Sequence, residues 1–227
     1  MKNKKILFFF TIAITFISNY SFSQKENFNY LINAQSLNGY TGNIITPSAY
    51  TTEYRKFSFG LHRFNIGVNY GIIKFCEIGI NLDLKGLAPF TWENFEQNFS
   101  STVALHAKYH IIRQYPEEKP FDFSAGFHRK NFYILLNRQF YEILDLVFET
   151  GLDLNLEEEK KLSYFLSLAK PTKYSYFILD YKSNLKQTNL GWRVLLSPDV
   201  KLDLFIIHVE KIKNIFDNFI FGLTLTS

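Results

Sequence analysis

The chain has 227 residues, a formal net charge of +4 and a single cysteine, Cys76. This length allows one large domain or two small ones, and a single cysteine excludes both an intramolecular disulfide and a cysteine-based metal cluster. Aromatic residues make up 18% of the chain, with 25 Phe and 14 Tyr. A chain of this kind must be held together by buried apolar contacts or by a membrane.

Residues 1–23 have the pattern of a secretory signal peptide. Three lysines precede the apolar run 6–17, and the small residues Ser21 and Ser23 stand just before Gln24. The apolar run is shorter than the roughly 20 residues that cross a bilayer, so we expect it to be cleaved. Cleavage lowers the net charge from +4 to +1, and we therefore expect no nucleic acid or other polyanion as a partner.

Residues 24–55 form an irregular segment that fits neither a strand nor a helix. Its centre reads GYTGNIITPSAY at 39–50, where glycine permits tight turns and proline stiffens the chain. Because the segment lies between the signal and the first strand, we predict that it tucks into or across the periplasmic mouth of a barrel, with its apolar side chains covered. The residues assigned to this possible plug are Gly39, Gly42, Ile44, Ile45, Pro47, Ser48, Ala49 and Tyr50.

From residue 56 to 227 the dominant period is two, which predicts half-buried strands. In FCEIGINLDLK, residues 75–85, apolar side chains from Cys76 to Leu84 alternate with Glu77, Gly79, Asn81, Asp83 and Lys85. Most predicted strands are longer than the usual 5–6 residues or so and approach the roughly 9–11 that a tilted strand needs to cross a bilayer. The predicted strands are 56–63, 65–73, 75–85, 100–112, 120–128, 130–138, 144–155, 161–169, 173–183, 188–197, 199–208 and 217–226.

The connections favour an all-β transmembrane antiparallel barrel of about twelve strands. Those expected on the inner side, such as 73–75 and 197–199, are tight, whereas outer ones such as 86–99 and 209–216 are mostly longer. Short inner turns and longer outer loops are typical of an outer-membrane barrel. A soluble secreted β-barrel binding protein or a β-sandwich would alternate too, with its apolar face turned inward.

The polar face of the strands is expected to line the lumen, and the apolar face is expected to meet lipid. Aromatic residues recur at positions where a girdle at the membrane–water interface is expected, namely Tyr70, Tyr109, Tyr164 and Trp192. A lumen filled by hydrogen-bonded side chains needs polar and paired charged residues. The residues assigned to the lumen are Glu77, Asp83, Lys85, His106, Lys108, His110, Arg193, Lys201 and Asp203.

Nothing in the sequence predicts a catalytic, cofactor-binding or metal site. His106 and His110 share a face but stand about 13 Å apart by strand rise, and the mutual position of His62 and His128 stays open. An outer-membrane lipid hydrolase would need a serine and a histidine on the lipid side. Only His208 is a candidate for that side, and no serine is clearly paired with it, so we do not expect an enzyme.

The opening stretch resembles the YjbH/GfcD-like family of outer-membrane barrels. The resemblance rests on Gly39, Gly42, Pro47, Ser48 and Ala49, followed by KFSFGLHR. It implies a role in exopolysaccharide or capsule production. Family members are usually far longer, and this chain has room for one small barrel.

Two functions follow for an outer-membrane protein of a Gram-negative cell. One is the export of an envelope polysaccharide through the lumen. The other is a structural or accessory subunit of an outer-membrane complex, since a barrel of this size can be filled by its own side chains. The expected partners are outer-membrane lipid and either polysaccharide or other outer-membrane proteins.

Overall fold

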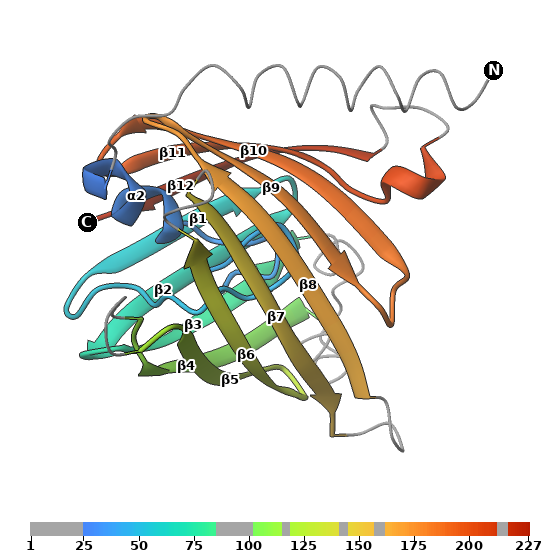
Figure 1. Ribbon diagram of the computed structural model, residues 1–227. Coiled ribbons are helices and arrows are strands. Elements are labelled where there is room, and N and C mark those ends of the chain that lie inside the picture. The colour runs from blue at the N-terminus through green and yellow to red at the C-terminus, as the bar shows by residue number, and fades with distance from the viewer. Residues whose placement is uncertain (1–24, 85–101, 115–118, 141–144, 157–161, 213–217) are drawn as a thin grey trace, which may run out of the picture.

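The protein is a closed antiparallel barrel of twelve strands with a segment of its own chain inside. The computed structural model describes residues 25–84, 102–114, 119–140, 145–156, 162–212 and 218–227. Each strand pairs with its neighbours in the sequence, and β1 pairs with β12 to close the sheet. Figure 1 shows the tilted strands wrapping around the interior. The predicted all-β barrel is therefore confirmed.

All twelve predicted strands are present, with ends that differ from the prediction by a few residues. They are β1 (Phe57–His62), β2 (Asn65–Ile73), β3 (Cys76–Asp83), β4 (Val103–Ile112), β5 (Asp122–His128), β6 (Asn131–Phe140), β7 (Leu146–Asn155), β8 (Leu162–Pro171), β9 (Ser175–Lys182), β10 (Gln187–Ser197), β11 (Val200–Ile206) and β12 (Phe219–Thr226). The predicted signal peptide and the loop 86–99 lie outside the described residues.

The two ends of the barrel have different connections. We call the end at which β1 begins and β12 ends the base, and the opposite end the far end. Residues 74–75, 113–121, 141–145, 172–174 and 198–199 join strands at the base, whereas 63–64, 84–102, 129–130, 156–161, 183–186 and 207–218 join them at the far end, which has the two longest connections. In three two-residue turns a residue with a left-handed backbone reverses the chain: Arg63 (φ 56°), Phe75 (φ 68°) and Arg129 (φ 56°).

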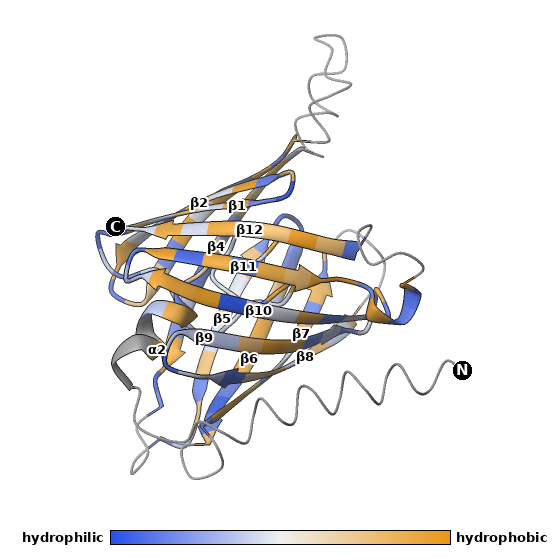
Figure 2. Cartoon of the chain, turned by 90° about the horizontal axis from the view of Figure 1, so that it is seen from above, coloured by the Kyte–Doolittle hydropathy of each residue, from blue (hydrophilic) through white to orange (hydrophobic). Residues whose placement is uncertain are grey.

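The outward face of the wall is apolar and exposed. Along β8, Leu162, Tyr164, Leu166 and Leu168 are exposed, and the residues between them are buried. The other strands repeat this alternation, and Figure 2 shows apolar (orange) and hydrophilic (blue) residues along the same strands. A soluble barrel has the opposite polarity, because the hydrophobic effect turns its apolar face inward.

The prediction of an irregular N-terminal segment is wrong for one part of it. Residues Lys25–Ile32 form a helix, α2, beside the C-terminus at the base (Figure 1). Phe28, Leu31 and Ile32 follow the helical spacing i, i+3, i+4 and are all buried. Two turns are too short for that period to stand out in the sequence. Among the described residues, no helix is long and apolar enough to cross a membrane.

Candidate functional site: the plugged lumen

The candidate site is the interface between the barrel wall and the segment inside it, residues 28–52, which we call the plug. The structure buries seven of the residues that the sequence assigned to it and half-buries Tyr50. Ile44 and Ala49 have no exposed surface, and Ile45 retains 7%. The strands and the plug therefore fill the interior together.

The plug folds on itself before it meets the wall. Isolated bridges pair Gln35 with Thr41 and Gly42 with Pro47. Gly39 provides the turn between Gln35 and Thr41 with φ +88°, a conformation that favours glycine. The Tyr40 hydroxyl donates to the Ile45 carbonyl over 2.8 Å, and burial raises the pKa of this phenol well above its usual value, which keeps it a donor.

Glu77 and Lys108 of the wall bind the two ends of the loop 41–52 by hydrogen bonds. The Glu77 carboxylate accepts from the N–H groups of Thr41 (3.1 Å) and Thr52 (2.8 Å) and from both hydroxyls. Lys108 lies 3.2 Å from Glu77 and donates to the Thr41 carbonyl over 2.7 Å. Because both charges are fully buried, each needs these partners to offset the loss of water.

Two further carboxylates bind plug atoms from the other side of the lumen. One oxygen of Asp180 accepts from three successive backbone N–H groups, those of Ile44 (3.1 Å), Ile45 (2.8 Å) and Thr46 (3.3 Å). Consecutive N–H groups that point at one anion form a nest, a recurrent anion-binding arrangement. Glu149 accepts from the Ala49 N–H over 3.2 Å and from the Asn43 side chain.

Arg193 binds carbonyls of the plug. Its guanidinium donates to the carbonyls of Gln35 (3.0 Å), Gly42 (3.1 Å) and Leu31 (3.3 Å). Its Nε lies 2.7 Å from Asp203, a carboxylate that also meets His62. The wall thus uses anions for the plug's N–H groups and cations for its carbonyls, so most of these contacts go to the main chain.

Glycines of the wall make room for the plug. A Cβ at Gly60 or Gly67 would collide with the Gln35 side chain, and one at Gly191 would press on Ile44. Gln35 fills the space over the two glycines and donates to the Ser58 carbonyl over 2.8 Å. These glycines stand on the polar face of the sequence pattern, where they mark positions at which a second segment approaches the strand.

The lumen is less polar than predicted. Inward residues on β7 to β12 build an apolar cluster against the plug, because the plug brings apolar side chains of its own. The members with no more than 5% exposure are Leu31, Ile44, Val147, Ala169, Tyr176, Ile178, Phe205 and Ile220. This half of the interface is an ordinary hydrophobic core, and the sequence pattern alone gave no reason to expect it.

The predicted luminal residues mostly point inward. Glu77, His106, Lys108, His110, Arg193, Lys201 and Asp203 are buried in the interior, and Asp83 is half-buried. Lys85 lies outside the described residues. The prediction missed Glu149 and Asp180, although each stands at an inward position of an alternating strand. A charged residue at such a position was the signal that could have found them.

Four of the five histidines lie on the inward face of the wall, at separate positions. His110 pairs with Asp122 at 2.9 Å, while His106 and His128 are direct cross-strand neighbours around the Tyr40 ring. His208 does not lie on the outward face of a strand as the hydrolase alternative requires, because β11 ends at Ile206. Among the described residues, no group of three or more His, Cys, Asp and Glu side chains could hold a metal ion.

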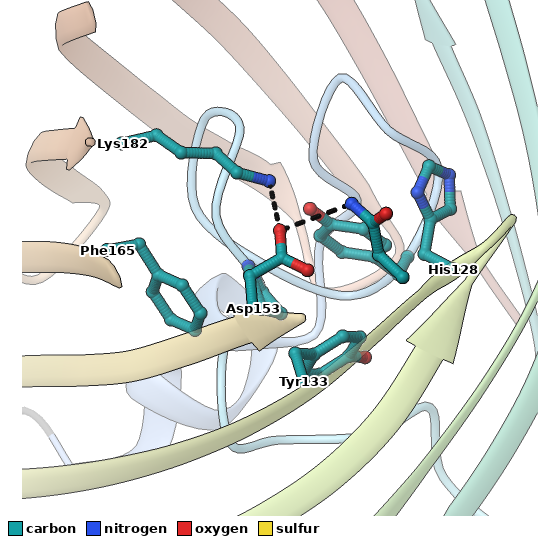
Figure 3. A pocket seen from close by; sticks show the side chains of 8 residues that line it. His128, Tyr133, Asp153, Phe165 and Lys182 are labelled. Atoms are coloured by element: carbon teal, nitrogen blue, oxygen red, sulfur yellow. Dashed lines mark hydrogen bonds and ion pairs between the residues drawn. The ribbon is translucent and has the colours of Figure 1, made fainter. Parts of the chain in front are cut away.

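A small recess remains at the far end of the lumen, between the plug and the strands β5 to β9 (Figure 3). Asp153 stands at its centre, 2.6 Å from Lys182 and 3.4 Å from the Asn131 side chain. The volume of the recess is about 10 Å³, roughly the space of one water molecule. The residues around it are Tyr40, Pro47, His128, Asn131, Tyr133, Asp153, Phe165 and Lys182. A sugar ring does not fit into this recess.

No family model matches the chain, and no curated protein matches it either.

Proposed function

We propose that the protein is an integral outer-membrane barrel of a Gram-negative cell, closed by its own N-terminal segment, that serves as a structural or accessory subunit of an outer-membrane complex. The observation that carries this proposal is the inverted polarity of the wall. Exposed apolar side chains surround the barrel, and the buried charges face inward. A closed barrel leaves no strand edge unpaired, which a bilayer requires.

The plug favours an accessory role rather than the passage of a polymer through the lumen. Glu77, Glu149, Asp180 and Arg193 are the charges that a conducting lumen would present to water, and here they bind the plug. A polymer would have to displace the plug and replace its hydrogen bonds. The outward wall and the far-end loops then remain as surfaces for partner proteins.

Export of an envelope polysaccharide is the second candidate. It is favoured by the way the wall closes, because every strand pairs with two other strands and none relies on the plug for pairing. An isolated bridge to the wall lies just after the plug, between Tyr54 and Gly71. Withdrawal of the plug would leave a lumen with polar and charged side chains beside the apolar inward residues of β7 to β12.

Conductance across a planar bilayer separates the two candidates. The complete mature chain is expected to insert and to show no stable open state, whereas a variant that lacks residues 25–52 is expected to conduct. Purification of the native protein in mild detergent should then recover other outer-membrane proteins with it. A stable open pore formed by the complete chain contradicts the accessory role and supports export.

Heat modifiability of the deletion variant in electrophoresis is the folding control. A folded barrel that stays silent without the plug means that side chains of the wall alone close the lumen. Failure of the complete chain to enter any bilayer contradicts the membrane assignment itself.

A further inference from the structure

Positively charged side chains stack on aromatic rings around the base of the barrel. In each pair the cationic group lies about 5 Å from the ring centre, within the distance of a cation–π contact. The pairs are Arg55 on Tyr54 (4.9 Å), Arg113 on Phe75 (4.9 Å), Arg138 on Phe140 (4.8 Å) and Lys173 on Tyr174 (5.2 Å). We call this set the base belt.

The base belt extends around much of the circumference. Its members come from the approach to β1, the β2–β3 turn with the end of β4, the end of β6 and the β8–β9 turn. All four cationic side chains are exposed, as are the rings of Tyr54, Phe75 and Tyr174. At the far end, the described residues contain one such pair, Arg63 over Phe64 at 5.7 Å. Among the described residues, the two rims therefore differ in the number of these pairs.

The chemistry of these pairs fits an anionic headgroup. Aromatic rings of membrane proteins concentrate at the level of the headgroups, and a guanidinium stacked on a ring is held in an orientation that leaves its N–H groups available. Within the described residues, Arg55, Arg113 and Arg138 form no ion pair with a carboxylate. A guanidinium binds phosphate oxygens through two parallel hydrogen bonds.

We propose that the base belt binds the phosphate groups of anionic phospholipids in the leaflet that surrounds the base. This inference rests on the proposed membrane insertion. Phospholipid phosphate is the occupant that fits, because the belt is positively charged, faces outward and lies at the edge of an apolar wall. A soluble anion would complement the charge but not the rings or the wall. Bound lipid would fix the height of the barrel in the bilayer.

Lipid retention measures this proposal directly. The mature chain is reconstituted into nanodiscs of equimolar phosphatidylcholine and phosphatidylglycerol, and the lipids that stay on the protein are counted by native mass spectrometry. In the bilayer the ratio of phosphatidylglycerol to phosphatidylcholine is one, and among the retained lipids we expect this ratio to be severalfold higher. The combined variant Arg55→Gln, Arg113→Gln and Arg138→Gln should return the retained lipids to the bulk ratio.

A matched variant controls for net charge. Arg63→Gln, Arg129→Gln and Lys186→Gln remove the same number of charges from the far end, and this variant should keep the enrichment. Equal loss in both variants overturns the proposal, since the effect would then be one of overall charge. Arg113→Lys, which keeps the charge without the planar fork, should show a partial loss and tests the belt if the combined variant does not fold.

The outcomes separate this inference from the proposed function. Insertion of the wild-type chain without enrichment of phosphatidylglycerol overturns the base belt and leaves the membrane assignment intact. A chain that stays outside the nanodiscs overturns the membrane assignment and the belt with it.

Discussion

The two faces of the barrel wall follow the same alternation but meet different physical requirements. On β8 the outward Leu166 is 38% exposed, and the neighbouring inward Ser167 is 2% exposed. The outward face needs only apolar surface, so many side chains would serve there. The inward face buries charges, and a buried charge needs specific partners. The inward face therefore requires a particular side chain at each position, whereas the outward face requires only that its side chains be apolar.

The plug supplies the partners that the inward face needs. Glu77 and Lys108 form an ion pair with each other, and both bind atoms of the plug. Arg193 forms an ion pair with Asp203 and binds carbonyls of the plug, and Asp203 also contacts His62. In a water-filled barrel these charges would be hydrated instead. Side chains of the lumen are therefore expected to be more sensitive to substitution than those outside, and four predictions test this contrast.

The largest effect is expected from Arg193→Met. The substitution keeps much of the volume but leaves Asp203 without its guanidinium and three plug carbonyls without their donor. Removing one partner of a buried ion pair costs about 3–5 kcal/mol. Urea unfolding of the reconstituted protein measures the loss. Arg193→Lys, which retains the charge, should lose less, and an unchanged urea midpoint for Arg193→Met would contradict the assigned role.

A charge on the outer wall ranks second. Leu166→Arg places a cation at the middle of β8, where the neighbouring outward residues are apolar. On the lipid face of a barrel such a change costs about 2–4 kcal/mol at the midplane. The free energy of unfolding from phospholipid vesicles should fall by this amount, and Leu166→Phe should leave it nearly unchanged. Full tolerance of Leu166→Arg means that this face does not meet lipid.

The third prediction concerns the fit of the plug. Gly67→Ala adds a Cβ that collides with the Gln35 side chain, and overpacking of this kind costs roughly 1–3 kcal/mol. Proteolysis of the plug should become faster. Gln35→Ala removes the closest contact and leaves the Gly39 Cα at 2.9 Å, so the double variant should lose less stability than the sum of the two single variants. Additive losses would mean that the two residues do not interact.

The smallest effect is expected at the exposed pair of Lys56 and Glu53, which are 2.9 Å apart with both side chains about half exposed. The hydrogen bond and charge of Glu53 raise the pKa of Lys56. The pair's contribution is therefore complete below the ordinary lysine pKa and is lost as the pH rises through the higher value of the folded state. We expect less than about 1 kcal/mol.

Unfolding free energies at neutral and strongly alkaline pH measure this contribution. Glu53→Gln should remove that part of the alkaline loss and change little at neutral pH. A large effect at neutral pH would show that the base depends on this ion pair more than its exposure suggests.

The sequence by itself determined the number of strands, their approximate ends and the face on which each residue stands. Period two is a local property, because successive side chains of a strand point to opposite sides whatever the strand pairs with. For this reason the alternation alone places Glu77 and Arg193 on the inward face, whatever their partners are. Charged residues at inward positions of β7 and β9, Glu149 and Asp180, carried the same local signal.

Only the tertiary structure decided what those inward residues bind. Asp180 meets the N–H groups of Ile44 to Thr46 across 134 to 136 positions of sequence, and no local pattern encodes such a contact. The same holds for the neighbouring His106 and His128 and for the packing of Phe205 in the apolar cluster. Barrel closure and the path of the plug set these contacts, and both depend on the whole chain folding together.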